Sequence, residues 1–271
     1  MKKNPEIDTL LATLNASVLK RYGQNFLVDV AVIEATFQAA AIQPGQTILE
    51  IGPGLGALTA QVPFDTTRYI SYEIDRSYHA YLSLKFPLHT THHLGSFLKA
   101  TPEKVDIILG NLPYYITSDI FEKIFKDFSS FQRGVFLIQK EVMGRLIAQP
   151  GTEHYGPLAI LIAMLGNVHM LRDVEPASFY PEPHVTSTLF WLERHPTLPV
   201  EDTRAFFYFL KKLFLNRRKN VINNLGFVAL EKEGILKTLS SLKIEENRRP
   251  EALTVEEIIA LYHSFLGKMK L

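Results

Sequence analysis

Short apolar runs rich in β-branched residues alternate with more polar, periodic segments through the first two-thirds of the chain. The short runs predict strands at residues 47–51, 68–74, 105–109 and 134–140. Between them, residues 30–41 and 119–128 repeat their apolar positions about every 3.6 residues, which predicts helices. Strands that alternate with helices in this way indicate a parallel sheet of the α/β class.

Two further runs complete the predicted sheet. Residues 161–171 ("LIAMLGNVHML") and 185–194 ("VTSTLFWLER") are close in sequence, so we expect them to form an antiparallel pair that closes the sheet. A mostly parallel sheet with one late antiparallel strand is more typical of a Rossmann-like class I methyltransferase domain than of a dehydrogenase.

The last quarter of the chain has a different pattern. Residues 193–204 contain two prolines and predict a linker. Three helices are predicted beyond it, at residues 202–225, 231–242 and 254–266. Thr254 is the predicted N-cap of the last helix, and Glu257 would complete a capping box. The sequence therefore predicts an α/β domain at residues 1–195 and a small helical domain at residues 196–271.

The composition is that of a globular protein, with 271 residues of which 46% are hydrophobic and 21% charged. The absence of cysteine excludes disulfides, thiolate metal sites and cysteine nucleophiles. The N-terminus lacks the apolar stretch of a secretory signal, and the longest apolar run, residues 158–165, is too short to cross a bilayer. We therefore expect a soluble cytoplasmic protein that does not bind membranes.

The net charge of +1 is unevenly distributed. Residues 196–271 contain 13 Lys and Arg against 9 Asp and Glu, whereas residues 1–195 contain the other 16 against 19. This excess of positive charge modestly favours a nucleic acid as the partner of the C-terminal domain.

A glycine-rich turn, "ILEIGPGLGALT", follows the first predicted strand and contains Gly52, Gly54 and Gly56. Glycines allow tight backbone turns and the close approach of a ligand. The G-x-G-x-G spacing differs from the G-x-G-x-x-G pattern that holds a dinucleotide pyrophosphate. It suits a nucleoside cofactor without a pyrophosphate, such as S-adenosylmethionine.

An acidic residue, Glu73, lies at the end of the next predicted strand. Beside such a cofactor its carboxylate would accept hydrogen bonds from the ribose hydroxyls. The alternative is a solvent-exposed carboxylate at a strand end. Asp75 is the predicted N-cap of the helix that follows.

The stretch "GNLPYYITSDI" begins where the strand at residues 105–109 ends, and ligands of open α/β sheets bind beyond the carboxyl ends of strands. Pro113 fixes its own φ and biases Leu112 toward an extended conformation, which leaves backbone carbonyls available. The Asn111 side-chain oxygen and a neighbouring carbonyl then provide two acceptors for an amino group. Tyr114 offers an aromatic face for stacking. The alternative is a proline-containing loop with incidental aromatic residues.

These groups predict a pocket for the exocyclic amine of a flat heterocycle such as adenine. The adenine amine is a poor nucleophile because its lone pair is delocalised into the ring. Hydrogen bonds that favour a pyramidal nitrogen would free the lone pair to attack a sulfonium methyl group. No general base is needed, since the proton becomes acidic only as the methyl group arrives, and a neutral Asn111 fits this chemistry.

The chain resembles the small-subunit ribosomal RNA adenine dimethyltransferases (the KsgA family) over nearly its whole length. The resemblance is carried by "YGQNFLVD" (22–29), "EIGPGLGALT" (50–59), "YEID" (72–75), "GNLPYYI" (110–116), "IQKEV" (138–142), "ASFYPEPHVTS" (177–187) and "NRRKNVINNL" (216–225). It implies S-adenosylmethionine as cofactor and small-subunit ribosomal RNA, within a pre-ribosomal particle, as the substrate of a monomeric enzyme.

The resemblance also assigns site residues. The cofactor would be held by Gln24, Asn25, Leu27, Gly52, Gly54, Glu73, Ser96 and Asn111, with Gly52 at its methionine end and Asn111 between cofactor and target. Leu112 and Tyr114 belong to the catalytic segment. Phe179 would be the second aromatic, sandwiching a flipped adenine against Tyr114.

Ser96 is a departure from the family pattern, which usually has an aspartate that binds the adenine amine of the cofactor. A serine can still form a hydrogen bond, but without charge assistance. We therefore expect weaker cofactor binding in this chain.

A basic run, "KKLFLNRRK", falls in the predicted helix at residues 202–225. An apolar stripe would be buried, leaving the charged residues Lys211, Lys212, Arg217, Arg218 and Lys219 toward solvent. Contact with RNA phosphates, above all through Lys211, Arg217, Arg218 and Lys219, is the favoured role, and a merely solvated helix face is the alternative. Lys20 and Arg21 would add to the same surface.

No metal site is expected. The run "HTTHH" brings His89, His92 and His93 together, but methyl transfer needs no metal and no further ligand is evident.

Two alternatives remain open for the function. One is the Erm family, which dimethylates large-subunit ribosomal RNA; it typically has isoleucine in place of Leu112 and lacks the "NRRK" segment. The other is a non-catalytic ribosome-assembly or transcription factor on the same scaffold. The presence of Gly52, Glu73, Asn111 and Tyr114 argues against a loss of catalysis.

Overall fold

A computed structural model describes residues 4–16, 24–195 and 199–269. Contacts divide the chain into two compact units. The first comprises residues 1–143 and 167–194, and the second comprises residues 144–166 and 195–271. The second unit resumes at His195, next to the predicted boundary, but it also takes in residues 144–166, which the sequence analysis placed in the first domain.

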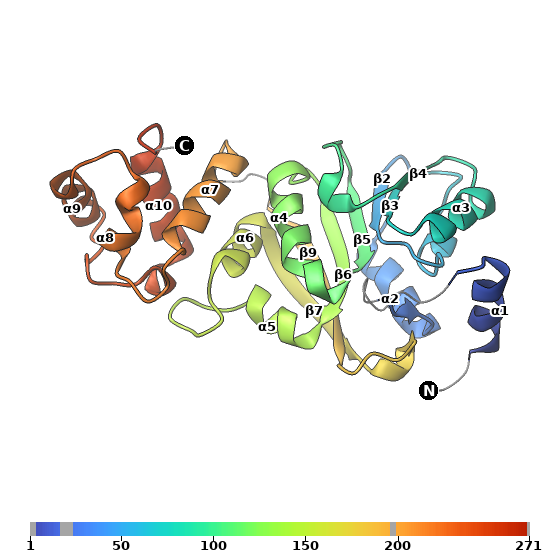
Figure 1. Cartoon of the computed structure of the whole chain (residues 1–271). Coiled ribbons are helices and arrows are strands. Elements are labelled where there is room, and N and C mark those ends of the chain that lie inside the picture. Colours follow the sequence, from blue (N-terminus) through green and yellow to red (C-terminus); the bar gives the residue numbers. More distant parts are fainter. Residues whose placement is uncertain (1–3, 17–23, 196–198, 270–271) are drawn as a thin grey trace. The chain divides into compact units, whose positions relative to one another are not determined.

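The first unit contains a seven-stranded sheet with the order β4-β3-β2-β5-β6-β9-β7 (Figure 1). Its strands are β2 (Thr47–Ile51), β3 (Arg68–Glu73), β4 (Thr90–Leu94), β5 (Ile107–Asn111), β6 (Arg133–Gln139), β7 (Gly166–Val174) and β9 (Ser187–Arg194). The five strands from β4 to β6 are parallel, and β9 is antiparallel to β6. The predicted mostly parallel α/β sheet with an antiparallel strand is confirmed.

Strands β7 and β9 are neighbours in the sheet. They are antiparallel, because a later residue of β7 contacts an earlier residue of β9 and an earlier residue of β7 contacts a later one. Thr188 Oγ1 donates to Asp173 Oδ1 at 3.0 Å, and the His169 and Trp191 rings stack with centroids 4.0 Å apart. The predicted pairing is therefore correct, but residues 161–165 belong to a helix, α6 (Pro157–Leu165). A short continuous apolar run cannot be assigned to strand or helix by periodicity, and Pro157 at the first turn favours the helix.

Within the described residues, the first unit also contains five helices and a small second sheet. The helices are α1 (Pro5–Thr13), α2 (Val30–Ala40), α3 (Arg76–Lys85), α4 (Thr117–Asp127) and α5 (Lys140–Leu146), the last of which continues past the unit boundary. Short 3₁₀ turns are η2 (Thr59–Gln61), η3 (Phe97–Lys99), η4 (Tyr114–Ile116) and η5 (Pro176–Ser178). Strands β1 (Phe26–Leu27) and β8 (Phe179–Tyr180) pair antiparallel.

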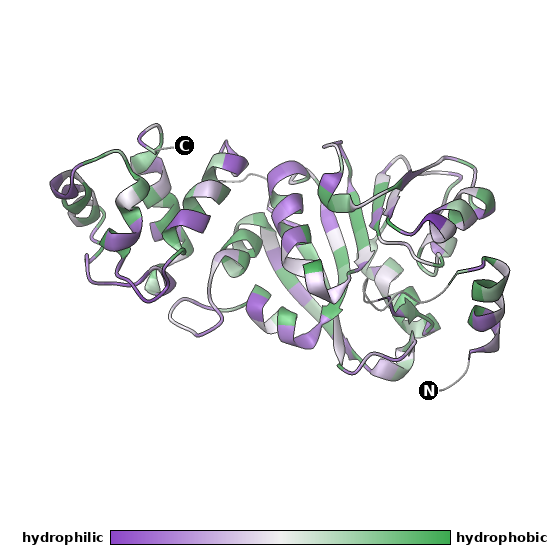
Figure 2. Ribbon diagram, in the orientation of Figure 1, coloured by the Kyte–Doolittle hydropathy of each residue, from purple (hydrophilic) through white to green (hydrophobic). Residues whose placement is uncertain are grey.

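The local sequence determines where these helices begin. The Asp29 side chain accepts hydrogen bonds from Ala31 N and Val32 N, which caps α2. The Asp75 side chain accepts from Ser77 N at 2.8 Å and caps α3, as predicted. Buried hydrophobic residues are concentrated along the inner strands β2, β5, β6 and β9, whereas the helices around them carry a mixture of hydrophobic and hydrophilic residues (Figure 2). The core of this unit is therefore built on the sheet.

The second unit is helical. It contains α6, α7 (Thr203–Leu213), α8 (Val221–Asn224), α9 (Lys232–Ser241) and α10 (Val255–Phe265), with 3₁₀ turns η6 (Leu225–Phe227) and η7 (Pro250–Ala252). The capping box of α10 is confirmed, since Thr254 Oγ1 accepts from Glu257 N and Glu257 Oε2 accepts from Thr254 N. None of the helices in the described ranges is long and apolar enough to span a membrane.

The single helix predicted at residues 202–225 is wrong. The predicted apolar stripe is buried, with Phe206, Phe209, Leu210, Leu213, Val221 and Leu225 all removed from solvent. The chain nevertheless leaves the helix after Leu213 and re-enters one at Val221. The buried side chain of Asn224 holds the intervening turn: its Nδ2 donates to Asn216 O at 3.1 Å and to Lys219 O and Asn220 O at 3.2 Å. Asn competes for backbone hydrogen bonds and so favours turns over helix interiors.

We expect Asn224→Ala to lower the free energy of unfolding by about 2 kcal/mol or more, because the substitution leaves several turn carbonyls without their donor. Urea denaturation of the purified protein measures this. Asn223→Ala is the matched control, since Asn223 lies on the same helix with an exposed side chain. Equal stability of the two variants would contradict the role given to Asn224.

Candidate functional site

A cavity of about 540 Å³ lies in the first unit, where β2, β3 and β5 end. It is lined by all the predicted cofactor-binding residues, namely Gln24, Asn25, Leu27, Gly52, Gly54, Glu73, Ser96 and Asn111, and also by Leu112 and Tyr114. Gly52, Gly54, Glu73, Ser96 and Asn111 meet there because the carboxyl ends of parallel strands lie at one edge of the sheet, whereas Gln24, Asn25 and Leu27 come from the segment before α2. Of the residues predicted for catalysis or cofactor binding, Phe179 is the one that does not line this cavity.

The glycine turn adopts a conformation that disfavours larger residues. Gly52 and Gly54 have φ of +68° and +59°, in the left-handed region. A Cβ atom at Gly54 would also lie 3.3 Å from the ring of Phe26. The N–H groups of Gly52 and Gly54 are used within the protein, where they donate to Tyr72 O at 3.0 Å and to Glu73 Oε2 at 2.9 Å.

Glu73 is a buried carboxylate held by the turn. Its Oε2 accepts from Gly54 N at 2.9 Å and its Oε1 accepts from Asp75 N at 2.8 Å. The side chain is 4% exposed, and burial raises the pKa of Glu73 while the backbone N–H bonds lower it. The alternative of an exposed strand-end carboxylate is therefore wrong. A carboxylate has about four acceptor sites, so two remain for hydroxyl donors in the cavity.

Asn111 is oriented by a hydrogen bond to Asn25, which also lines the cavity. Its Nδ2 donates to the Asn25 backbone carbonyl at 2.9 Å. Because the amide nitrogen points at that carbonyl, the side-chain Oδ1 is directed elsewhere, and Asn111 itself lines the cavity. This geometry supports the predicted role of Oδ1 as an acceptor.

The residues after Asn111 determine which carbonyl can act as the second acceptor. Pro113 O accepts from Thr117 Oγ1 at 3.1 Å and from Ile116 N at 3.3 Å. The Leu112 N–H donates to Leu137 O at 3.0 Å, which anchors the segment to β6. With the Pro113 carbonyl engaged, the neighbouring acceptor is the Leu112 carbonyl.

Tyr114 is the aromatic residue of this segment. Its hydroxyl is 2.9 Å from Ser187 Oγ at the start of β9, which fixes the half-buried ring beside the cavity. Burial raises the pKa of Tyr114, so the ring remains neutral and suited to stacking.

Phe179 is placed differently from the prediction. It pairs with Leu27 in the β1–β8 sheet and is 2% exposed, packed in the core cluster with Leu27 and Val174. In this structure it therefore cannot sandwich a base against Tyr114. To do so, its ring would have to leave the core packing that now surrounds it.

Ser96 lines the cavity and caps η3, where its Oγ accepts from Leu98 N at 3.3 Å. Its hydroxyl hydrogen is not used in this bond. Ser96 can thus donate to a ring nitrogen, whereas the aspartate of the family pattern can only accept from an amine.

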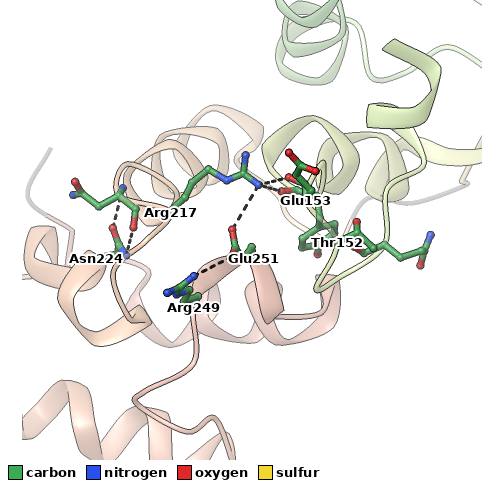
Figure 3. A network of polar contacts seen from close by, with 9 residues as sticks. Thr152, Glu153, Arg217, Asn224, Arg249 and Glu251 are labelled. Atoms are coloured by element: carbon green, nitrogen blue, oxygen red, sulfur yellow. Dashed lines mark hydrogen bonds and ion pairs between the residues drawn. The ribbon is translucent and has the colours of Figure 1, made fainter. Parts of the chain in front are cut away.

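The basic run does not form one helical face. The side chain of Arg217 is 47% exposed, but its Nη2 is used within the second unit, where it donates to Glu153 O at 2.7 Å and Tyr155 O at 2.9 Å (Figure 3). Glu251 Oε2 lies 3.6 Å from the same nitrogen. Arg217 therefore links separate segments of this unit through its hydrogen bonds. Arg218 and Lys219 are exposed on the turn that Asn224 organises, and Lys211 Nζ lies 5.2 Å from the centre of the Phe207 ring.

Lys20 and Arg21 lie outside the described residues. Of the histidines considered as metal ligands, His92 lies on the edge strand β4, and its Nδ1 is 2.8 Å from Ser71 Oγ. His93 stacks on Tyr72 with ring centroids 4.6 Å apart. Both have structural contacts that account for them.

Sequence reasoning missed two contributors to the cavity. The first is α1, whose residues Glu6, Ile7 and Leu10 line it. Asn4 followed by Pro5 and two first-turn acids is a helix-start signal that could have revealed α1. No comparable signal places the helix over the cavity.

The second contributor is Glu50, which is 2% exposed and lines the cavity from β2. Its Oε2 accepts from Tyr69 OH at 2.7 Å and Thr59 Oγ1 at 2.9 Å. Burial raises the pKa of Glu50 to about 7, and the nearby Glu73 carboxylate contributes to the rise. A buried carboxyl group that is half protonated near neutral pH thus lies at the base of the cavity.

Comparison with known proteins gives consistent matches along the chain. The family model described as "Ribosomal RNA adenine dimethylase" matches residues 15–266. Among curated relatives, the "Ribosomal RNA small subunit methyltransferase A" of Lactobacillus johnsonii is 34% identical, over 90% of this chain and 89% of that protein. The protein of the same name from Syntrophotalea carbinolica is 37% identical, over 90% of this chain and 95% of that protein.

Solved structures share the fold. A dimethyladenosine transferase from Plasmodium falciparum has a TM-score of 0.76 and 23% identity, covering 90% of this chain and 98% of that one. The 23S rRNA methyltransferase ErmE has a TM-score of 0.62 and 23% identity, covering 89% and 99%. At this identity the two structures support the architecture and do not distinguish between substrates.

We expect the unliganded protein to lose stability as the pH rises from 5 to 8. The folded-state pKa of Glu50, about 7, exceeds the ordinary value of 4.5, so protonated Glu50 favours folding and ionisation at higher pH opposes it. Glu50→Gln keeps the acceptor oxygen but cannot ionise. The decline between pH 5 and 8, measured by urea denaturation, should be smaller in this variant by about 2–3 kcal/mol. Parallel pH profiles for the two proteins would contradict the assignment.

Proposed function

Because the chain belongs to the ribosomal RNA adenine dimethylase family, we propose that it transfers methyl groups from S-adenosylmethionine to the N6 amines of adenosines, two adjacent ones each dimethylated, in small-subunit ribosomal RNA. One observation carries this proposal. At the end of β5, the oriented Asn111 amide, the Leu112 carbonyl and the Tyr114 ring meet the same cavity as the glycine turn and Glu73.

The cavity suits the cofactor because its donors and acceptors match a charged nucleoside. Two acceptor sites on the buried Glu73 remain for the ribose hydroxyls, and the glycine turn allows close approach at the methionine end. Ser96 would meet the edge of the cofactor's adenine as a donor. When bound, S-adenosylmethionine supplies an electrophilic methyl group, and the residues of the chain hold and orient the reactants.

The target amine is activated by acceptors alone. Asn111 Oδ1 and the Leu112 carbonyl would each accept one N–H bond of the target amine, which favours a tetrahedral nitrogen and frees its lone pair. Tyr114 would stack on the base and hold the nitrogen in line with the methyl group. The proton lost after transfer is acidic, so no residue of tuned pKa is required at this position.

Exposed cations of the second unit are assigned to the RNA substrate. Arg218 and Lys219 are exposed cations on a rigid turn, and they suit phosphate contacts. Relatives named for the small subunit favour small-subunit RNA. We further propose that this RNA is modified within a pre-ribosomal particle, in the cytoplasm, by a monomer. The large-subunit and non-catalytic alternatives are outcomes of the experiment that follows.

The deciding experiment incubates the protein with labelled S-adenosylmethionine and small ribosomal subunits that lack the modification, with large-subunit RNA as the comparison. Nucleoside analysis should find N6,N6-dimethyladenosine in the small subunit. Dimethyladenosine in the large-subunit RNA alone would overturn the substrate. Cofactor binding without methyl transfer to either RNA would support the non-catalytic alternative.

Asn111→Ala should reduce single-turnover methyl transfer about 100-fold or more, because the acceptor acts mainly on the reacting amine in the transition state. The protein should remain folded and should still bind the cofactor. Asn167→Ala, an exposed asparagine of the same unit, is the control and should transfer methyl groups at the wild-type rate. A wild-type rate in Asn111→Ala would refute the activation scheme.

The double variant Arg218→Ala/Lys219→Ala should weaken RNA binding and reduce the slope of log affinity against log salt by roughly 1 to 2, because two phosphate contacts are lost. Arg217→Ala should instead lower the free energy of unfolding by about 1–3 kcal/mol, since its carbonyl partners lose their donor. Filter binding across a salt series and urea denaturation measure the two effects. If Arg217→Ala weakened RNA binding and the double variant did not, Arg217 would be the RNA contact.

A further inference from the structure

Helix α1 covers part of the cofactor cavity. It begins at the N-cap Asn4, whose Oδ1 accepts from Ile7 N at 3.2 Å. Glu6, Ile7 and Leu10 line the cavity from this helix. A ligand in the cavity therefore has α1 as one of its walls.

The apolar anchoring of α1 is slight. Within its described residues, Leu11 is the one that is buried, and it packs in a small cluster with Phe26 and Tyr78, against which the partly exposed Ile7 and the C-cap Leu14 also pack. A nine-residue helix with a single buried side chain gains little stability from burial. Its position therefore depends strongly on the polar contacts that it makes.

One such contact joins α1 to strand β8. The hydroxyl of Tyr180 donates to Asp8 Oδ1 on α1. Tyr180 lies on β8, opposite Phe26 of β1, in the strand that also carries Phe179. Hydrogen bonds to a carboxylate are stronger than bonds between neutral groups, and the Asp8 carboxylate raises the pKa of Tyr180, which keeps the hydroxyl protonated as a donor.

We propose that Tyr180 is a positioning residue that holds α1 over the cofactor cavity through Asp8 and so retains bound cofactor. The inference rests on the proposed function, because it takes the ligand of this cavity to be S-adenosylmethionine or its product. The residue does not touch the reacting atoms. It acts by keeping the wall of the cavity in place.

The test measures the dissociation rate of S-adenosylhomocysteine from the full-length protein by stopped-flow displacement. Tyr180→Phe removes the donor and Asp8→Ala removes the acceptor, and each should speed dissociation about tenfold, the effect of one charge-assisted hydrogen bond. Asp8→Asn keeps an acceptor oxygen but loses the charge, so its rate should lie between those of the wild type and Asp8→Ala. The double variant Tyr180→Phe/Asp8→Ala should be no faster than either single variant, because both remove the same interaction.

Thr13→Val is the matched control on the same helix, since its hydroxyl bonds to Thr9 O within the exposed last turn. Thermal unfolding of each unliganded variant separates a loss of folding from a loss of retention. A structural role alone would lower the unliganded midpoint and leave the dissociation rate unchanged.

Wild-type dissociation rates in folded Tyr180→Phe and Asp8→Ala would overturn the inference while leaving the proposed function intact. A wild-type protein that binds neither S-adenosylmethionine nor S-adenosylhomocysteine would instead overturn the proposed function, and the inference with it.

Discussion

The hydrogen bond from Asn111 Nδ2 to the Asn25 carbonyl is the contact on which the site depends. It joins the segment before the sheet to the last residue of β5, and it directs Asn111 Oδ1 away from the Asn25 carbonyl. A reversed amide would direct a donor at the target amine and could not favour its pyramidal form. The proposed chemistry therefore depends on one backbone carbonyl 86 residues away in sequence.

The parallel sheet supplies the rest of the arrangement. It places the glycine turn, Glu73 and Asn111 at the ends of neighbouring strands, where backbone hydrogen bonds from Gly54 and Asp75 offset the cost of burying the Glu73 carboxylate. Glu50 lies behind them with a raised pKa, supported by Tyr69 and Thr59. The cavity thus concentrates acidic groups next to the place assigned to a positively charged cofactor. This arrangement opposes folding near neutral pH and favours binding of a cation.

The sequence predicted those parts of the molecule that depend on local pattern. The strands predicted at residues 47–51, 68–74, 105–109 and 134–140 were correct to within about two residues, as were the glycine turn, the Asp75 cap, the Thr254–Glu257 capping box and the family. Residues 161–165 were wrongly predicted as strand, and β4 was not predicted. Long-range packing decided what was missed. The break in the helix after Leu213 depends on hydrogen bonds made by Asn224. The hydrogen bonds of Arg217 depend on carbonyls of a segment about 60 residues earlier. The burial of Phe179 and the position of α1 likewise follow from packing that no local motif encodes.

The central claim is that two acceptors on the protein hold the target amine. It is tested most directly by a crystal structure of the protein with S-adenosylhomocysteine and an adenosine-containing RNA fragment. The account predicts that the N6 atom lies within about 3.2 Å of both Asn111 Oδ1 and the Leu112 carbonyl oxygen, with the base stacked on Tyr114. An adenine bound in the cavity with its N6 directed away from both oxygens would contradict it.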